Sequence, residues 1–63
     1  MTLRCGQTHL LSFKGRSDVF LLLERDTGAE PDEPFWLAVR LSDGRVASVS
    51  EDWLLSDDGE LIA

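Results

Sequence analysis

A chain of 63 residues is long enough for one small domain, and folding at this size buries only about 60% of the surface of the unfolded chain. A single cysteine and a single histidine exclude an internal disulfide and give too few ligands for a Cys/His zinc site, so we expect no metal and no cofactor. The 12 acidic and 6 basic residues give a net charge of −6, which disfavours direct binding to nucleic acid and favours a partner with basic character. We expect a single domain over residues 1–63, with a flexible N-terminus over residues 1–6.

The longest apolar run, from Val19 to Leu23, has the length of a strand and is too short for a membrane span. The N-terminus shows no apolar run long enough for a signal peptide. A lone cysteine agrees with a reducing compartment. We therefore expect a cytoplasmic protein that does not bind a membrane.

The first predicted elements are two strands. Residues 7–13 alternate weakly, with His9, Leu11 and Phe13 on one side, and residues 14–18 supply a turn. Residues 19–24 are apolar on both faces, which predicts a strand that is covered on both sides. A helix is the competing interpretation because leucine favours helices, but the run is short and is bounded by turn residues.

A polar loop follows, from Asp26 to Pro34. It contains one glycine and two prolines and is long for a hairpin connection. Such a loop is a candidate recognition loop, and it carries the acidic residues Glu30, Asp32 and Glu33.

The strongest pattern is a hairpin. Residues 35–41 alternate with period two, residues 46–49 form the returning strand, and Asp43-Gly44 supplies the turn, because glycine accepts a positive φ without strain. In the first of these strands one face, which we expect to be buried, consists of Phe35, Leu37, Val39 and Leu41. The opposite face then carries Trp36, Ala38 and Arg40.

The C-terminal residues predict one helical turn and a short strand. Ser50 followed by Glu51 and Asp52 is a helix-start pattern, but only about one turn fits before residues 56–59 break it. We expect a single 3₁₀ turn from Glu51 to Leu54 and a last strand over residues 60–62.

This order of elements resembles the SH3-like small-barrel architecture that SH3, Tudor and KOW-type modules share. The resemblance extends over residues 8–62 and is carried by Val39-Arg40-Leu41-Ser42-Asp43-Gly44-Arg45-Val46, then Val49 and the turn Glu51-Asp52-Trp53-Leu54. It implies an all-β fold, a small five-stranded and partly open barrel, and a general habit of binding.

The individual families narrow what the resemblance implies. Peptide-binding SH3 modules use tyrosines in a proline-recognition groove, and this chain has no tyrosine. KOW-type modules are usually basic, whereas this chain is acidic. Tudor-type readers enclose methylated basic side chains in an aromatic cage, to which Trp36, Trp53 and Phe20 are candidate contributors.

Not every apolar side chain of these strands fits inside one small core, so the sequence predicts an apolar binding strip. Its candidate residues are Phe20, Leu22, Trp36 and Trp53, since aromatic residues are enriched where interfaces concentrate their energy. A rim of carboxylates around the strip is expected from Glu30, Asp32, Glu33, Glu51 and Asp52. The alternative is that both tryptophans are buried as lids over the open ends of the barrel.

No motif predicts an enzyme. Cys5 and His9 are four residues apart, a spacing that aligns two residues on a helix and not on a strand, so packing or an N-terminal tail is their expected fate. The expected function is a small acidic protein–protein interaction module or regulatory subunit, whose aromatic strip binds a partner with a basic surface. The alternative is an inhibitor of phage or mobile-element type, which mimics nucleic acid and occupies a DNA- or RNA-binding protein. The apolar strip also suits a homodimer.

Overall fold

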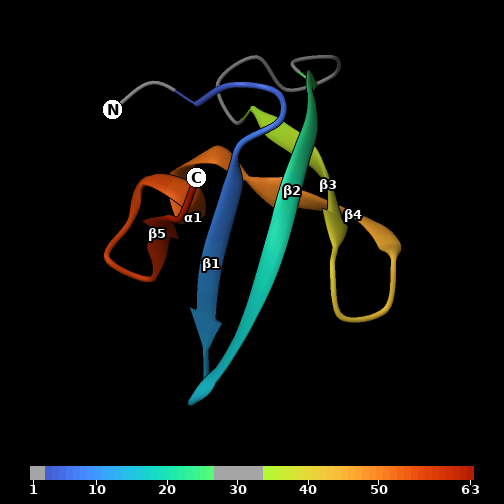
Figure 1. The fold of residues 1–63 in the computed structure, drawn as a ribbon. Coiled ribbons are helices and arrows are strands. Elements are labelled where there is room, and N and C mark those ends of the chain that lie inside the picture. The colour runs from blue at the N-terminus through green and yellow to red at the C-terminus, as the bar shows by residue number, and fades with distance from the viewer. Residues whose placement is uncertain (1–2, 27–33) are drawn as a thin grey trace.

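The computed structural model describes residues 3–26 and 34–63, in which five antiparallel strands form one sheet in the order β4-β3-β2-β1-β5. The elements are β1 (Thr8–Phe13), β2 (Arg16–Asp26), β3 (Phe35–Arg40), β4 (Arg45–Ser50), α1 (Glu51–Leu55) and β5 (Gly59–Leu61). Figure 1 shows β1 and β2 side by side, with β3 and β4 on one side of them and β5 on the other. The predicted all-β class and the partly open arrangement are confirmed, because β4 and β5 are edge strands and the sheet does not close.

The β1–β2 hairpin is tighter than predicted. Lys14 and Gly15 alone join the two strands, with φ of 51° and 77°, the two positive values that a type I′ turn needs. This turn matches the twist of the flanking strands, so β2 begins directly after it, at Arg16, and has 11 residues.

The β3–β4 hairpin is where the sequence predicts it. Its loop covers residues 41–44 and ends at Gly44, whose φ is 72°. The Gly44 N–H donates to the Arg40 carbonyl at 2.7 Å, and Arg40 lies opposite Arg45. Glycine is required here because a side chain disfavours this left-handed conformation.

One face of the sheet, here called the inner face, packs against α1 and forms the core. The buried apolar residues of this core are Leu11, Phe20, Leu22, Trp36, Ala38, Val49 and, from α1, Leu54. His9 is fully buried on the same face, opposite Phe20. The other face of the sheet is called the outer face below.

The predicted faces of β3 are wrong. Trp36 and Ala38 are 4% and 0% exposed, so they belong to the core. The residues expected in the core, which are half-buried or exposed on the outer face, are Phe35, Leu37, Val39 and Leu41. The physical reason is that Trp36 lies opposite the buried Val49, and that α1, which continues directly from β4, covers the side of Trp36.

β2 is fully buried on one side only, whereas the sequence predicts cover on both sides. Phe20 and Leu22 are buried, whereas Val19 and Leu21 on the other side are half-buried and Leu23 is 41% exposed. A β-bulge after Leu22 adds one residue to β2 and shifts the register, so that Arg25 lies opposite Trp36. Bulges bend the strand that contains them, which agrees with the curvature of the sheet in Figure 1.

The predicted 3₁₀ turn is a single turn of α-helix. α1 has Glu51 and Asp52 in its first turn, and Ser50 precedes it without making a side-chain capping bond. The chain then turns back so closely that a Cβ at Gly59 would lie 2.9 Å from the carbonyl carbon of Leu54. Gly59 is therefore needed for β5 to reach its place beside β1.

The described part of the N-terminus contacts the sheet. Leu3 packs against the core, and the Gly6 N–H donates to the Leu22 carbonyl at 2.8 Å. Residues 1–2 lie outside the described residues, as do residues 27–33, which carry most of the predicted recognition loop and the rim candidates Glu30, Asp32 and Glu33.

Candidate functional site

The residues of the predicted apolar strip do not form an exposed surface. Phe20, Leu22 and Trp36 are 8%, 0% and 4% exposed, so the prediction that they form an exposed patch is wrong. The cause is the inverted assignment of the sheet faces described above. Trp53 is partly exposed and packs at the border of the core. The alternative, that both tryptophans are buried, therefore holds for Trp36 and not for Trp53.

Glu51, a predicted rim carboxylate, stabilises the core. Its Oε2 accepts hydrogen bonds from Arg25 Nε at 2.7 Å and from Trp36 Nε1 at 2.9 Å. The hydrogen bond from Arg25 is the main cause that lowers the pKa of Glu51. Glu51 therefore satisfies the buried indole N–H, whereas its neighbour Asp52 is exposed.

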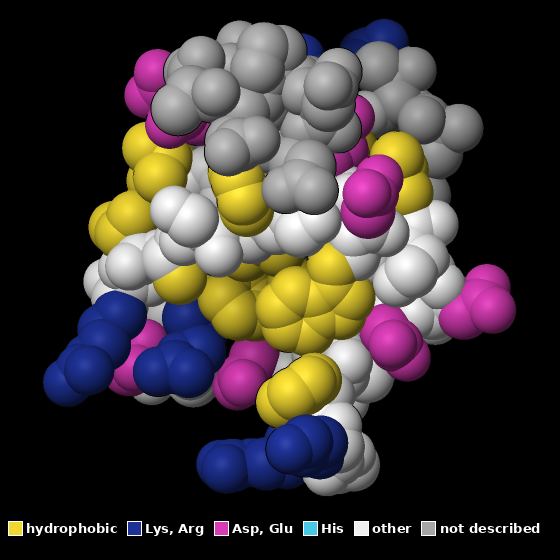
Figure 2. Space-filling view, turned by 180° about the vertical axis from the view of Figure 1, so that it is seen from behind, with side chains coloured by type: hydrophobic (Ala, Val, Ile, Leu, Met, Phe, Trp, Pro, Cys, Tyr) yellow, Lys and Arg dark blue, Asp and Glu magenta, His cyan; other side chains and the backbone are white. Residues whose placement is uncertain are grey.

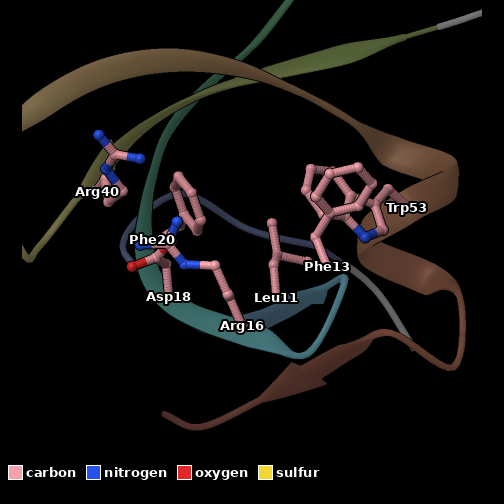
Figure 3. A pocket seen from close by; sticks show the side chains of 7 residues that line it. All are labelled: Leu11, Phe13, Arg16, Asp18, Phe20, Arg40 and Trp53. Atoms are coloured by element: carbon pink, nitrogen blue, oxygen red, sulfur yellow. The ribbon is translucent and has the colours of Figure 1, made fainter.

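A pocket of about 270 Å³ opens on the inner face, at the end of the sheet where the β1–β2 turn lies. Its lining residues are Leu11, Phe13, Arg16, Asp18, Phe20, Arg40 and Trp53. Figure 3 shows Phe13 and Trp53 together on one side of the pocket and Asp18 and Arg40 on the other. The volume suits one large side chain and is slightly below the range of about 300–1,000 Å³ that is typical of small-molecule sites.

The strand period and the tight turn together build this pocket. In the hairpin register Phe13 lies opposite Arg16, and Leu11 lies opposite Asp18. Residues directly opposite each other in an antiparallel pair share one face of the sheet, so the turn brings apolar and charged side chains to the same place. Trp53 completes the wall from α1.

The aromatic wall of the pocket is accessible. The ring centroids of Phe13 and Trp53 are 6.0 Å apart with an interplanar angle of 69°, a favourable edge-to-face contact. Phe13 is nevertheless 61% exposed, and Lys14 Nζ lies 5.3 Å from its ring centroid. A partner that covers the exposed part of this wall gains apolar contact area on a pair that is already positioned.

Basic residues gather at this end of an acidic chain. Four of the six basic residues are here, namely Lys14, Arg16, Arg40 and Arg45, together with the acidic residues Asp18 and Asp43. Figure 2 shows Lys and Arg side chains at the bottom and at the left of a central apolar group. These are the places where Figure 1, seen from the other side, has the β1–β2 turn and the β3–β4 loop. Cations are therefore concentrated at these two turns although the chain as a whole is negative.

These cations differ in their pairing. Arg40 forms an ion pair with Asp43, with Nε 3.2 Å from Oδ1, and Arg45 Nε lies 3.7 Å from Asp43 Oδ2. The hydrogen bond from Arg40 is the main cause that lowers the pKa of Asp43 to about 2. Arg16 makes no ion pair with the residues that the structure describes, which leaves its guanidinium available to an anionic group.

Sequence reasoning missed Phe13 and Arg16 as site residues. The sequence contained a signal for these two residues, because a two-residue turn at Lys14-Gly15 places Phe13 opposite Arg16 across the hairpin. Lys-Gly is a weaker hairpin signal than Asn-Gly or Asp-Gly, and the polar run that follows it favours a longer loop.

The other chemistry-bearing residues do not form a second site. Cys5 is exposed before β1, whereas His9 is buried in β1, and burial lowers the pKa of His9. Within residues 3–26 and 34–63, no three His, Cys, Asp or Glu side chains are grouped so that they could hold a metal ion. The same residues contain no helix of the length and apolar character needed to cross a membrane.

The pocket thus offers apolar area, an aromatic pair and an available guanidinium, which are means of binding. No family model, curated protein or solved structure matches this chain.

Proposed function

We propose that this chain is a small protein–protein interaction module with an SH3-like barrel architecture. Two features support the architecture: β1 lies between β2 and β5 in the sheet, and one helical turn connects β4 to β5. Both agree with the layout that the sequence resembles. The proposed binding site is the pocket lined by Phe13, Trp53 and Arg16.

One observation carries this proposal. Phe13 is 61% exposed although it stands in edge-to-face contact with Trp53 at the mouth of a pocket. Aromatic anchors beside a pocket are typical of the residues that dominate binding energy at protein interfaces. Truncation of such an anchor typically weakens binding by about 2 kcal/mol or more.

The pocket also indicates the chemistry of the docking segment. Its size suits one aromatic or large apolar side chain. Arg16, without an ion pair among the described residues, suits a carboxylate next to that side chain, because guanidinium and carboxylate form charge-assisted hydrogen bonds. We therefore assign to the partner a short segment in which an aromatic residue is flanked by acidic residues.

The net charge also predicts a partner with a basic surface. We place the contact with that basic surface away from the pocket. β2 begins at the pocket with Arg16 and carries the exposed Glu24 towards its other end, so Glu24 lies away from the aromatic wall. A partner with an acidic docking segment and a basic surface around it complements both the pocket and the acidic part of this molecule.

Nucleic acid is the competing class. Aromatic rings beside cations also bind single-stranded nucleic acid, but a net charge of −6 opposes the approach of a phosphate backbone. The inhibitor that mimics nucleic acid remains a prediction from composition, and it requires carboxylates rather than the Phe13–Trp53 wall.

Photo-crosslinking in cells of the native host tests the proposal. The photoreactive analogue benzoylphenylalanine replaces Phe13 in one version and Leu55, 48% exposed on α1 and absent from the pocket lining, in a matched control. We expect a protein adduct from position 13 only, and expect Arg16→Glu to abolish it. Sequencing of the adduct should give an acidic segment with an aromatic residue.

Two outcomes contradict the proposal. Equal adducts from positions 13 and 55 would show that the pocket is not the binding site. An adduct from position 13 that is sensitive to nuclease and not to protease would assign the site to nucleic acid.

A further inference from the structure

Among the described residues, no helix covers the outer face of the sheet, which is largely apolar. The strand register places on it the exposed Val46 and five half-buried apolar residues, namely Leu10, Val19, Leu21, Leu37 and Val39. Leu41 follows β3 in the loop, where its N–H donates to the Val19 carbonyl at 2.9 Å. Val46, Val39 and Leu21 form one continuous apolar row across three strands, which ends at Thr8 on β1. Val46 and Leu41 are 60% and 52% exposed, and α1 covers the other face.

The two faces of this sheet carry charge in an unusual way. An antiparallel sheet with one solvated face normally places apolar residues inside and polar residues outside. Here Arg16, Asp18 and Arg40 lie on the inner face at the pocket, whereas the outer-face rows that cross both β1 and β2 contain apolar residues, serine and threonine up to Glu60 on the edge strand β5. The other charged outer-face residues are Glu24 and Asp26, which lie opposite Leu37 and Phe35 where β2 extends beyond β1.

We propose that two copies of this chain pack their outer faces together as a homodimer. A face without central charges offers no ion pair to a charged partner, but it is complementary to itself when a two-fold axis brings two such faces together. Two sheets that pack face to face form a sandwich, with apolar side chains interdigitated between them. A 63-residue domain also gains stability from oligomerisation, because it buries little surface on its own.

The area of the face indicates the strength of this dimer. Four strands about 4.8 Å apart, with six residues of about 3.3 Å each, project to roughly 380 Å², so two copies bury about 800 Å² or more. Specific interfaces bury about 1,200–2,000 Å² in total, and weaker ones bury less. The dimer should therefore dissociate on dilution through the micromolar range.

This interface is separate from the pocket. Phe13 and Trp53 lie on the inner face, so a dimer formed through the outer faces leaves both pockets open. Failure of the dimer does not affect the proposed binding site, and failure of the pocket does not affect the dimer.

Sedimentation equilibrium of the complete chain between about 1 and 500 µM tests the dimer. The wild-type mass should rise from 7.0 kDa towards twice that value. Val46→Lys places a cation on the face and, independently, Leu41→Lys places one in the loop after β3, both at exposed positions, and both variants should remain at 7.0 kDa over the whole range. Leu55→Lys, on an equally exposed leucine of α1, should dimerise like the wild type.

Circular dichroism of each variant checks that it is folded. A folded wild type that stays at 7.0 kDa at 500 µM overturns the proposal. So does undiminished dimerisation of folded Val46→Lys and Leu41→Lys, because the contact would then lie on another surface.

Discussion

The contact between Glu51 and Trp36 makes a quantitative prediction about stability. Glu51→Ala removes the carboxylate that accepts the Trp36 Nε1–H bond at 2.9 Å. Trp36 is only 4% exposed, so the indole N–H is left without a partner in the core, which typically costs about 1–3 kcal/mol. The lost ion pair with Arg25 adds little, because the Arg25 side chain is 47% exposed.

A double-mutant cycle isolates this hydrogen bond. In a Trp36→Phe background the indole N–H is absent, so Glu51→Ala should then have a much smaller effect on the free energy of unfolding. We expect a coupling energy of about 1–2 kcal/mol between the two positions. Asp52→Ala, at the exposed neighbouring position, is the matched control and should change stability by less than about 0.5 kcal/mol.

Urea unfolding followed by circular dichroism measures all five proteins: the wild type, the three single variants and the double variant. A coupling energy near zero would refute the reasoning, because it would mean that Glu51 does not satisfy Trp36. A large effect of Glu51→Ala that persists in the Trp36→Phe background would attribute the stabilisation to Arg25 instead.

Three further predictions concern other sites. Gly59→Ala brings a Cβ against the Leu54 carbonyl and should lower the midpoint of thermal unfolding, with a loss of about 1–3 kcal/mol if the backbone does not shift. Burial lowers the pKa of His9 below 6.5, so the unfolded chain binds the proton more readily; stability should be full above pH 6.5 and fall as the pH drops through the folded pKa, and this loss should be absent from His9→Leu in pH-dependent unfolding. Asp43 should titrate near pH 2 by carbon-detected NMR, and Arg40→Ala should move its pKa back towards 3.8; an unchanged pKa would contradict the role of that hydrogen bond.

The sequence was sufficient to locate the elements because turn chemistry is local. Gly44, which lies between two strand patterns, predicts a hairpin turn, and the short run after Ser50 leaves room for one helical turn only. These features depend on a few adjacent residues. The all-β class and the pairing of β1 with β2 and of β3 with β4 follow from them, since short connections join neighbouring antiparallel strands. The place of β5 beside β1, at the edge opposite β4, does not follow from local signals.

The sequence was not sufficient to say which face is inside. β3 has Leu37 and Val39 on one face and Trp36 and Ala38 on the other, and period two fits both assignments. Two non-local features decide between them: α1 covers the Trp36 side, and Glu51, fifteen positions later in the chain, accepts the indole N–H. Neither feature is visible in the alternation of one strand.

The pocket was not predictable for a related reason. Its residues come from β1, β2, β3 and α1, and the contact between Phe13 and Trp53 joins positions far apart in the chain. The net charge also pointed away from it, because a total of −6 does not reveal that four of the six cations lie near the two hairpin turns. Local charge becomes visible only when the hairpin register places Arg16 and Arg40 on the same face.

The two tryptophans allow the most direct test of the binding site, because each gives one indole signal in a ¹H–¹⁵N NMR spectrum. The probes are three short capped ligands: a phenylalanine flanked by aspartates, the same peptide with lysines in place of the aspartates, and a thymidine oligonucleotide. The acidic peptide should shift the indole signal of Trp53, which lines the pocket, and leave that of Trp36, which is sealed by Glu51, in place. Equal shifts of both indoles, or a larger response to the lysine peptide or to the oligonucleotide, would contradict the assignment of this pocket to an acidic aromatic segment.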